Sequence, residues 1–182
     1  MTAGPQFDLG EDAEVRPFEP DDAWDLFAVV DAERERLRVW LPWVDRVLSV
    51  EDERAWLESV VPTGGNLGGL GIFVAGQVAG GIGLRRDASG VSGDIGYWLS
   101  KDYEGHGLVT RASRILIEHA FSQLGLHRIT IHAAPDNARS RAIPDRLGFT
   151  REGVLREAER TGTGYRDLVV YGLLEREWRA RP

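Results

Sequence analysis

Two glycines enclose a histidine at Gly105-His106-Gly107, directly after a strand-like run and before an amphipathic helix pattern. A helix start leaves about four backbone N–H groups unpaired and carries a partial positive charge. Glycine lets a ligand approach such a backbone closely, so the stretch could bind an anion, most simply a phosphate. A plain strand-to-helix turn, in which glycine only relieves strain, explains the same residues.

Two known phosphate loops can be tested against these glycines. The P-loop requires a lysine after its second glycine, and none follows here. The dinucleotide-binding fingerprint requires a third glycine where Thr110 stands. That fingerprint also comes early in a βαβ unit, whereas three strands and two helices are predicted to precede these glycines. The sequence therefore excludes both loops.

The other reactive residue types narrow the chemistry further. The chain has no cysteine, which excludes disulfides, thiolate metal sites and a cysteine nucleophile. It has no G-x-S-x-G motif of a serine hydrolase. His127 and His132 are expected on opposite faces of one strand, so the histidines predict no metal site.

Length and charge restrict the class of protein. The 182 residues suit one domain, and their net charge of −7 divides into −10 for residues 1–60 and +3 for residues 61–182. Nucleic-acid binding is not expected without a strongly basic face. The acidic half suits a cationic ligand or is a solvated surface. With no run of roughly 18 apolar residues and no secretory signal, a cytoplasmic protein without a membrane segment is expected.

Hydrophobic periodicity and turn residues predict an α+β (mixed α/β) domain. Residues 1–12 are expected to form a poorly ordered tail. The predicted strands are Glu14–Phe18, Gly71–Ala75, Val78–Arg86, Asp94–Ser100, Arg128–Ala133, Thr150–Arg156 and Tyr165–Leu174. The predicted helices run from Pro20 to near Trp40, from Glu51 to Val60, from Gly107 to Gly125 and from Asn137 to Leu147, and Pro62–Gly71 is predicted as a loop.

Taken together, five blocks of the chain resemble the Gcn5-related N-acetyltransferase (GNAT) family, specifically its RimJ/RimL-like group. The blocks are Val15–Phe27, Leu41–Asp45, Asp94–Ala112, Asp136–Glu157 and Tyr165–Trp178. The resemblance implies a single domain over residues 1–182. Its mostly antiparallel sheet would have about seven strands, splayed between the fourth and fifth, with about four flanking helices. It also implies an enzyme that transfers an acetyl group from acetyl-CoA to a primary amine.

The resemblance further implies a binding role for particular residues. Trp98 and Leu99 would pair with the pantetheine arm of acetyl-CoA as an added strand would. Asn137 would bond the pantetheine. The residues expected at the pyrophosphate are Gly105, His106, Gly107, Leu108, Thr110 and Arg111.

Two positions depart from the family pattern. Asp102 stands where the family usually has arginine or glutamine, and we expect its carboxylate to point away from the phosphates. Pro144 stands where many members have the tyrosine that protonates the leaving thiolate, so Ser140 is the expected substitute.

The resemblance implies Glu159 as the general base, because it follows the sixth predicted strand where RimL-like proteins have a glutamate, although a solvated charge explains it too. A backbone N–H near Leu99 would stabilise the oxyanion. Trp40, Trp43 and Tyr97 are expected at the acceptor, although such aromatics also serve as loop anchors.

The resemblance favours a protein N-terminal amine as acceptor. A small amine such as a polyamine or an antibiotic remains an alternative, as does a non-catalytic acyl-CoA sensor. The resemblance is also compatible with a homodimer.

Overall fold

The computed structural model describes residues 4–60, 66–162 and 164–181. Its eight strands follow the order β1-β2-β3-β4-β5-β6-β8-β7 in a mixed sheet. The chain divides into two compact units, one comprising residues 1–83 and 97–112 and the other residues 84–96 and 113–182. Strands β4 (Gln77–Arg86) and β5 (Ser92–Leu99) and helix α4 (Leu108–Ser122) contribute residues to both. No helix in the described ranges is long and apolar enough to cross a membrane.

The first unit combines an antiparallel sheet with short helices. Strands β1 and β2 form a hairpin, and β2 pairs with β3 in a register that runs from Ala13↔Val74 to Pro17↔Leu70. The elements are β1 (Phe7–Gly10), β2 (Ala13–Pro17), η1 (Pro20–Asp22), α1 (Ala23–Ala32), α2 (Arg34–Leu37), η2 (Val44–Arg46), α3 (Val50–Ser59), β3 (Leu67–Val74) and η3 (Lys101–Tyr103).

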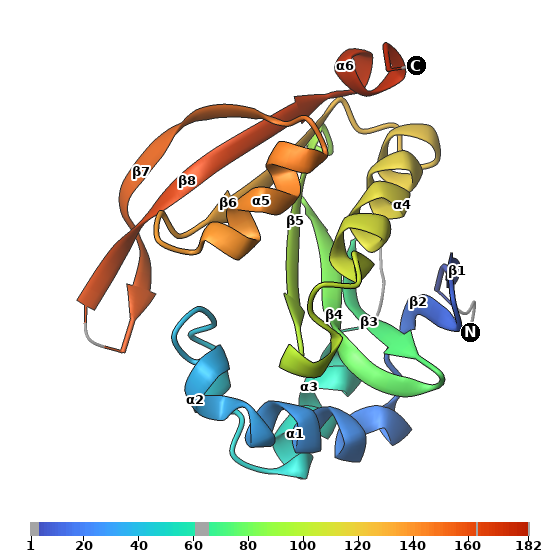
Figure 1. Ribbon diagram of the computed structural model, residues 1–182, viewed down its shortest axis with the longest axis vertical. Helices are drawn as coiled ribbons and strands as arrows, with labels where there is room; N and C mark the ends of the chain where they lie inside the picture. The colour runs from blue at the N-terminus through green and yellow to red at the C-terminus, as the bar shows by residue number, and fades with distance from the viewer. Residues whose placement is uncertain (1–3, 61–65, 163, 182) are drawn as a thin grey trace. The chain divides into compact units, whose positions relative to one another are not determined.

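Helices α1 and α3 lie side by side and bury one apolar cluster (Figure 1). Leu26 and Val30 of α1, Leu57 of α3 and Phe73 of β3 belong to this cluster. The side chain of Ser49 caps α3 by accepting a hydrogen bond from the Asp52 N–H. This cluster anchors the segment between α2 and α3, which includes Trp40 and Trp43.

The second unit contains a pair of parallel strands and a long β-hairpin. β5 pairs in parallel with β6 (Arg128–Ala133), from Ser92↔Arg128 to Asp94↔Thr130. β6 pairs antiparallel with β8 (Gly164–Leu174), which forms a curved hairpin with β7 (Thr150–Thr161) in Figure 1. Helix α5 (Ala138–Arg146) follows β6, and helix α6 (Glu175–Arg179) follows β8.

Several predicted elements are corrected by the structure. Phe7–Gly10 forms strand β1 within the expected poorly ordered tail, because it pairs with β2; the eight strands of the sheet agree with the about seven that the resemblance implies. The helix from Pro20 is interrupted at Glu33, where the backbone leaves helical geometry. β3 begins at Leu67, inside the predicted Pro62–Gly71 loop, whose residues 62–65 lie outside the described residues. The predicted Arg128–Ala133 strand is confirmed.

Candidate active site

The glycine turn has the backbone that its sequence predicts. Gly105 and Gly107 have φ angles of +86° and +70°, a region that residues with a Cβ rarely adopt. Helix α4 begins directly afterwards, and its Arg111 N–H donates to the Gly107 carbonyl at 3.0 Å. The N–H groups of Leu108, Val109 and Thr110 therefore precede the first helical hydrogen bond. The turn thus presents several backbone donors at the positive end of a fifteen-residue helix.

This backbone is open enough for a ligand to reach it. A Cβ built at Gly105 would meet no described atom within 4 Å, and one at Gly107 would meet only Arg111 Nη1, at 4.0 Å. Leu108 is buried and anchors the helix start, whereas His106 is exposed. The backbone of the turn is therefore open to an anionic ligand, and its predicted role at the pyrophosphate stays a prediction.

Charged side chains surround the turn. Arg111 forms a 3.1 Å ion pair with Glu11, whose side chain is largely exposed. The Nε of Arg111 is buried and has no hydrogen-bond partner among the described residues. An ion pair with so exposed a partner is weak, so an anionic ligand could compete for this guanidinium. Asp102 and Lys101 are both exposed in η3, and the expected orientation of Asp102 away from the phosphates remains a prediction.

The end of β5 directs one amide away from β4. The Ser100 N–H donates to Ala79 O of β4 at 2.7 Å, and the Lys101 N–H donates to the Glu33 carboxylate at 2.9 Å. Because backbone groups alternate along a strand, the N–H and C=O of Leu99 point to the side opposite β4. Of these three amides, only that of Leu99 is directed neither at β4 nor at Glu33, and its role as an oxyanion donor stays a prediction.

The tryptophans expected at the acceptor are partly used for packing. Trp43 and Trp98 meet edge to face, with ring centroids 6.2 Å apart, and both pack against the α1–α3 cluster. This geometry favours a loop-anchor role for Trp43. Trp40 is half-buried, and its N–H donates to Leu37 O at the end of α2. Tyr97 is also half-buried.

In the second unit, Asn137 and Ser140 are joined at the start of α5. The Asn137 side-chain oxygen accepts from the Ser140 N–H at 3.1 Å, which makes Asn137 the N-cap of the helix. Arg141 holds the same turn by donating to Pro135 O at 2.7 Å and to the Tyr171 hydroxyl at 3.1 Å. Asn137 therefore retains its amide nitrogen for a ligand while its oxygen is used by the helix. The sequence predicts the family role of Asn137 but not this second one.

Pro144 is buried inside α5, where its ring removes the helical hydrogen bond to Ser140 O. A tyrosine acid is thus absent from this position, and Ser140 remains the predicted proton donor.

Glu159 lies opposite Arg166 in the β7–β8 register, and Arg166 Nε donates to Glu159 Oε2 at 2.5 Å. The Glu159 side chain is about one-third exposed. A base role would use its other oxygen, and it stays a prediction.

A cluster that sequence reasoning missed lies where β5 and β6 pair. Asp94 Oδ1 lies 2.6 Å from His132 Nδ1 and 3.0 Å from Thr130 Oγ1, while Arg85 contacts the other oxygen at 3.3 Å. Burial alone would raise the pKa of Asp94, but the hydrogen bond and charge of His132, together with Thr130 and Arg85, hold that pKa below its usual value. A carboxylate on Nδ1 orients an imidazole and leaves Nε2 for proton transfer. Only the strand register reveals this pair, because 38 residues separate the two side chains.

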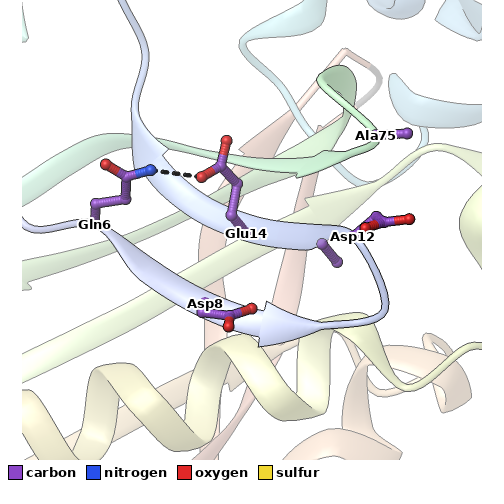
Figure 2. A pocket seen from close by; sticks show the side chains of 6 residues that line it. Gln6, Asp8, Asp12, Glu14 and Ala75 are labelled. Carbon is purple, nitrogen blue, oxygen red and sulfur yellow. Dashed lines mark hydrogen bonds between the residues drawn. The ribbon is translucent and has the colours of Figure 1, made fainter.

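Some of the acidic residues that give residues 1–60 their net charge of −10 line a surface depression of the first unit. Figure 2 shows Asp8, Asp12 and Glu14 around it, with the Gln6 amide donating to Glu14 at 2.6 Å. These carboxylates lie on the β1–β2 hairpin and its turn. Part of the negative charge of residues 1–60 therefore lies on this hairpin.

Comparison with known proteins identifies the family. Residues 13–150 match the acetyltransferase (GNAT) domain model. The chain belongs to the GNAT acetyltransferase family. It is 36% identical to the protein named "Putative ribosomal N-acetyltransferase YdaF" of Bacillus subtilis (strain 168), over 93% of this chain and 95% of that protein. It is 29% identical to the ribosomal-protein-serine acetyltransferase of Escherichia coli (strain K12), over 80% of this chain and 83% of that one.

A solved structure shares the fold. RimL, described as a ribosomal L7/L12 alpha-N-protein acetyltransferase in complex with coenzyme A, superposes with a TM-score of 0.87. The match covers 95% of this chain and 99% of RimL at 23% identity. The domain match and the two sequence relatives place the chain in the RimJ/RimL-like group of the GNAT family. The enzyme is an acyltransferase that depends on acetyl-CoA.

Proposed function

We propose that this enzyme acetylates protein N-terminal α-amines by direct attack of the amine on acetyl-CoA. The observation that carries the proposal is the open glycine turn at the start of α4, in a chain that matches the GNAT domain. The acceptor class rests on the relatives, since the names of YdaF and of the Escherichia coli enzyme both refer to ribosomal acetylation.

Each proposed binding role follows from the chemistry of a described group. The N–H groups after Gly105 and Gly107 bind the pyrophosphate, and Arg111 adds positive charge. The Leu99 N–H faces away from β4, towards the pantetheine arm and its thioester, while the Leu99 carbonyl already accepts from Arg36. The Asn137 amide nitrogen donates to the same arm. These roles agree with the family pattern.

The ionisation of the acceptor favours an α-amine. An α-amino group has a pKa near 8, so about a tenth is neutral and nucleophilic at pH 7. A lysine side chain with a pKa near 10.4 would need roughly 3 kcal/mol more to lose its proton. An N-terminal amine therefore needs only a modest base, the role that we assign to Glu159.

The bond changes in the proposed reaction balance without another reactant. The amine nitrogen attacks the thioester carbonyl carbon, and the Leu99 N–H donates to the oxyanion that forms. The carbon–sulfur bond then breaks, and the electron pair leaves with the thiolate. The amine gives a proton to Glu159, and the Ser140 hydroxyl protonates or hydrogen-bonds the thiolate. If Ser140 gives up its proton, the proton taken by Glu159 returns through solvent to the Ser140 oxygen; otherwise it passes through solvent to the thiolate.

Release of coenzyme A tests the function directly, because a chain without cysteine leaves the released thiol as the only one that a thiol reagent detects. The acceptor panel comprises a ribosomal-type peptide with a free N-terminus, its N-blocked form carrying a lysine, a polyamine and an aminoglycoside. We expect release only with the free N-terminus.

Release with the polyamine alone would replace this function by small-amine acetylation, which the acidic depression around Asp8 and Asp12 would suit. Tight acetyl-CoA binding without release for any amine would instead indicate a non-catalytic sensor.

A further inference from the structure

Glu33 and Arg36 hold the chain segment that joins the end of β5 to the glycine turn. Glu33 lies between α1 and α2 and accepts hydrogen bonds from the Ser100 hydroxyl at 2.5 Å and from the Lys101 N–H at 2.9 Å. Arg36 Nε donates to the same carboxylate at 2.6 Å. One side chain thus connects two consecutive residues after β5 with a cation of α2.

Arg36 extends this connection in two directions. Its Nη2 donates to the Leu99 carbonyl at 2.8 Å, and its Nη1 donates to Glu104 Oε1 at 3.1 Å. Leu99 carries the proposed oxyanion donor, and Glu104 immediately precedes Gly105. The planar guanidinium is suited to bridging several acceptors in fixed directions.

The network is more than a surface ion pair. The side chains of Glu33, Arg36 and Glu104 are 17%, 31% and 27% exposed. Burial alone would raise the pKa of Glu33, but hydrogen bonds from Ser100, Lys101 and Arg36 hold that pKa below its ordinary value. Glu33 therefore stays ionised at neutral pH and keeps accepting from all of these donors.

We infer that Glu33 and Arg36 are positioning residues for acetyl transfer, an inference that rests on the proposed roles of Leu99 and the glycine turn. The peptide unit between Leu99 and Ser100 is held at both ends, at its carbonyl by Arg36 and at its N–H by Ala79 O. This constraint fixes the direction of the neighbouring Leu99 N–H. A displacement of about 1 Å at such a group can lower a rate about 100-fold.

Arg36 also has an electrostatic role at the turn. The carboxylate of Glu104 lies one residue before the glycines that are proposed to bind pyrophosphate, where it would repel the phosphates. The Arg36–Glu104 ion pair compensates that negative charge. One residue therefore influences the rate of transfer through Leu99 and the affinity for acetyl-CoA through Glu104.

Steady-state kinetics on four variants of the full chain separate these effects. Arg36→Ala should lower kcat about 100-fold and raise the KM for acetyl-CoA about tenfold, the scale of one charge contact near a surface. Arg36→Lys should lower kcat less than Arg36→Ala, because the lysine ammonium keeps the positive charge. It should still lower kcat, because an ammonium does not reproduce the planar arrangement of the guanidinium donors. The double variant Arg36→Ala/Glu104→Gln should recover the KM but not kcat. The matched control Arg38→Ala removes an exposed cation that follows α2 and should change neither constant.

Thermal unfolding distinguishes positioning from a general structural effect. We expect each variant to melt within about 5 °C of the wild type, and kcat measured well below melting to remain low. A folded Arg36→Ala variant with wild-type kcat would refute the inference, as would a double variant that recovers kcat and KM together.

Failure of the proposed function can be distinguished from failure of the positioning inference. If the wild type releases coenzyme A with no amine, N-acetylation fails, and calorimetric titration with acetyl-CoA then tests the positioning of the turn. An Arg36→Ala affinity equal to that of the wild type would reject that positioning.

Discussion

Glu53 is a buried carboxyl group whose ionisation should oppose folding. It is 2% exposed on α3, and its Oε1 has no hydrogen-bond partner among the described residues. Burial and repulsion by Asp52 raise its pKa from 4.5 to about 7, although Arg34 acts in the opposite direction. The folded protein therefore binds a proton at Glu53 in a range of pH where the unfolded chain has lost it.

The sign and size of the effect follow from this difference. The free energy of unfolding should fall as pH rises from 4.5 towards about 7, and the full cost applies above that value. A shift from 4.5 to about 7, at about 1.4 kcal/mol per unit, corresponds to roughly 3 kcal/mol. Glu53→Gln removes the ionisation, so its stability relative to the wild type should increase by roughly that amount between pH 4.5 and pH 8.

Urea unfolding followed by tryptophan fluorescence at pH 4.5, 6, 7 and 8 measures this difference. His119, whose pKa is lowered by burial, contributes equally to both proteins, so its effect cancels. Glu58→Gln is the matched control, since Glu58 is exposed on the same helix and its curve should parallel the wild type. If the Glu53→Gln curve also parallels the wild type over this range, the reasoning from burial is refuted.

Three further predictions concern the active site. Gly107→Glu should weaken acetyl-CoA binding at least tenfold by calorimetry, through backbone strain and added negative charge, and an unchanged affinity would reject the pyrophosphate site. Asn137→Asp should keep the helix cap and the melting temperature but raise the KM for acetyl-CoA, whereas Asn137→Ala should also lose about 1 kcal/mol of stability; equal KM values for Asn137→Asp and the wild type would leave only the cap. Ser140→Ala and Glu159→Gln should each lower kcat by at least about tenfold, and wild-type rates in both would remove the proposed proton transfers and direct attention to the Asp94–His132 pair.

Local sequence signals predicted much of the fold because each has a short-range cause. The alternation over Arg128–Ala133 specified β6, and Gly105 and Gly107 marked the start of α4. Strand β1 was missed because its pairing with β2, rather than its own composition, orders it. The break at Glu33 was missed for a similar reason, since that residue is held by Ser100 and Lys101, 67 and 68 residues away.

The candidate site shows the same division. The positive φ angles of Gly105 and Gly107 follow from residue type and position, so the sequence could predict them. The contacts of Asp94 with His132 and of Arg36 with Leu99 depend on strand register and on how helices meet a strand end. No local sequence pattern predicts either contact, because the two residues of each pair are far apart in the sequence. The acceptor roles of Trp40 and Trp43 could not be decided, because an aromatic pair packs equally well in a core or around a ligand.

The irregular backbone of β7 has a consequence for the behaviour of the protein at high concentration. β7 lies at the edge of the sheet, and its register with β8 shifts between Leu155 and Glu159, where Glu157 has a φ angle of +50° and bonds Asp167. A regular edge strand offers an uninterrupted template for intermolecular pairing. This shift and another between Arg151 and Gly153 divide the edge into three short stretches with different twist. A strand from another molecule could extend only one of them, so the long hairpin is protected from edge-to-edge aggregation.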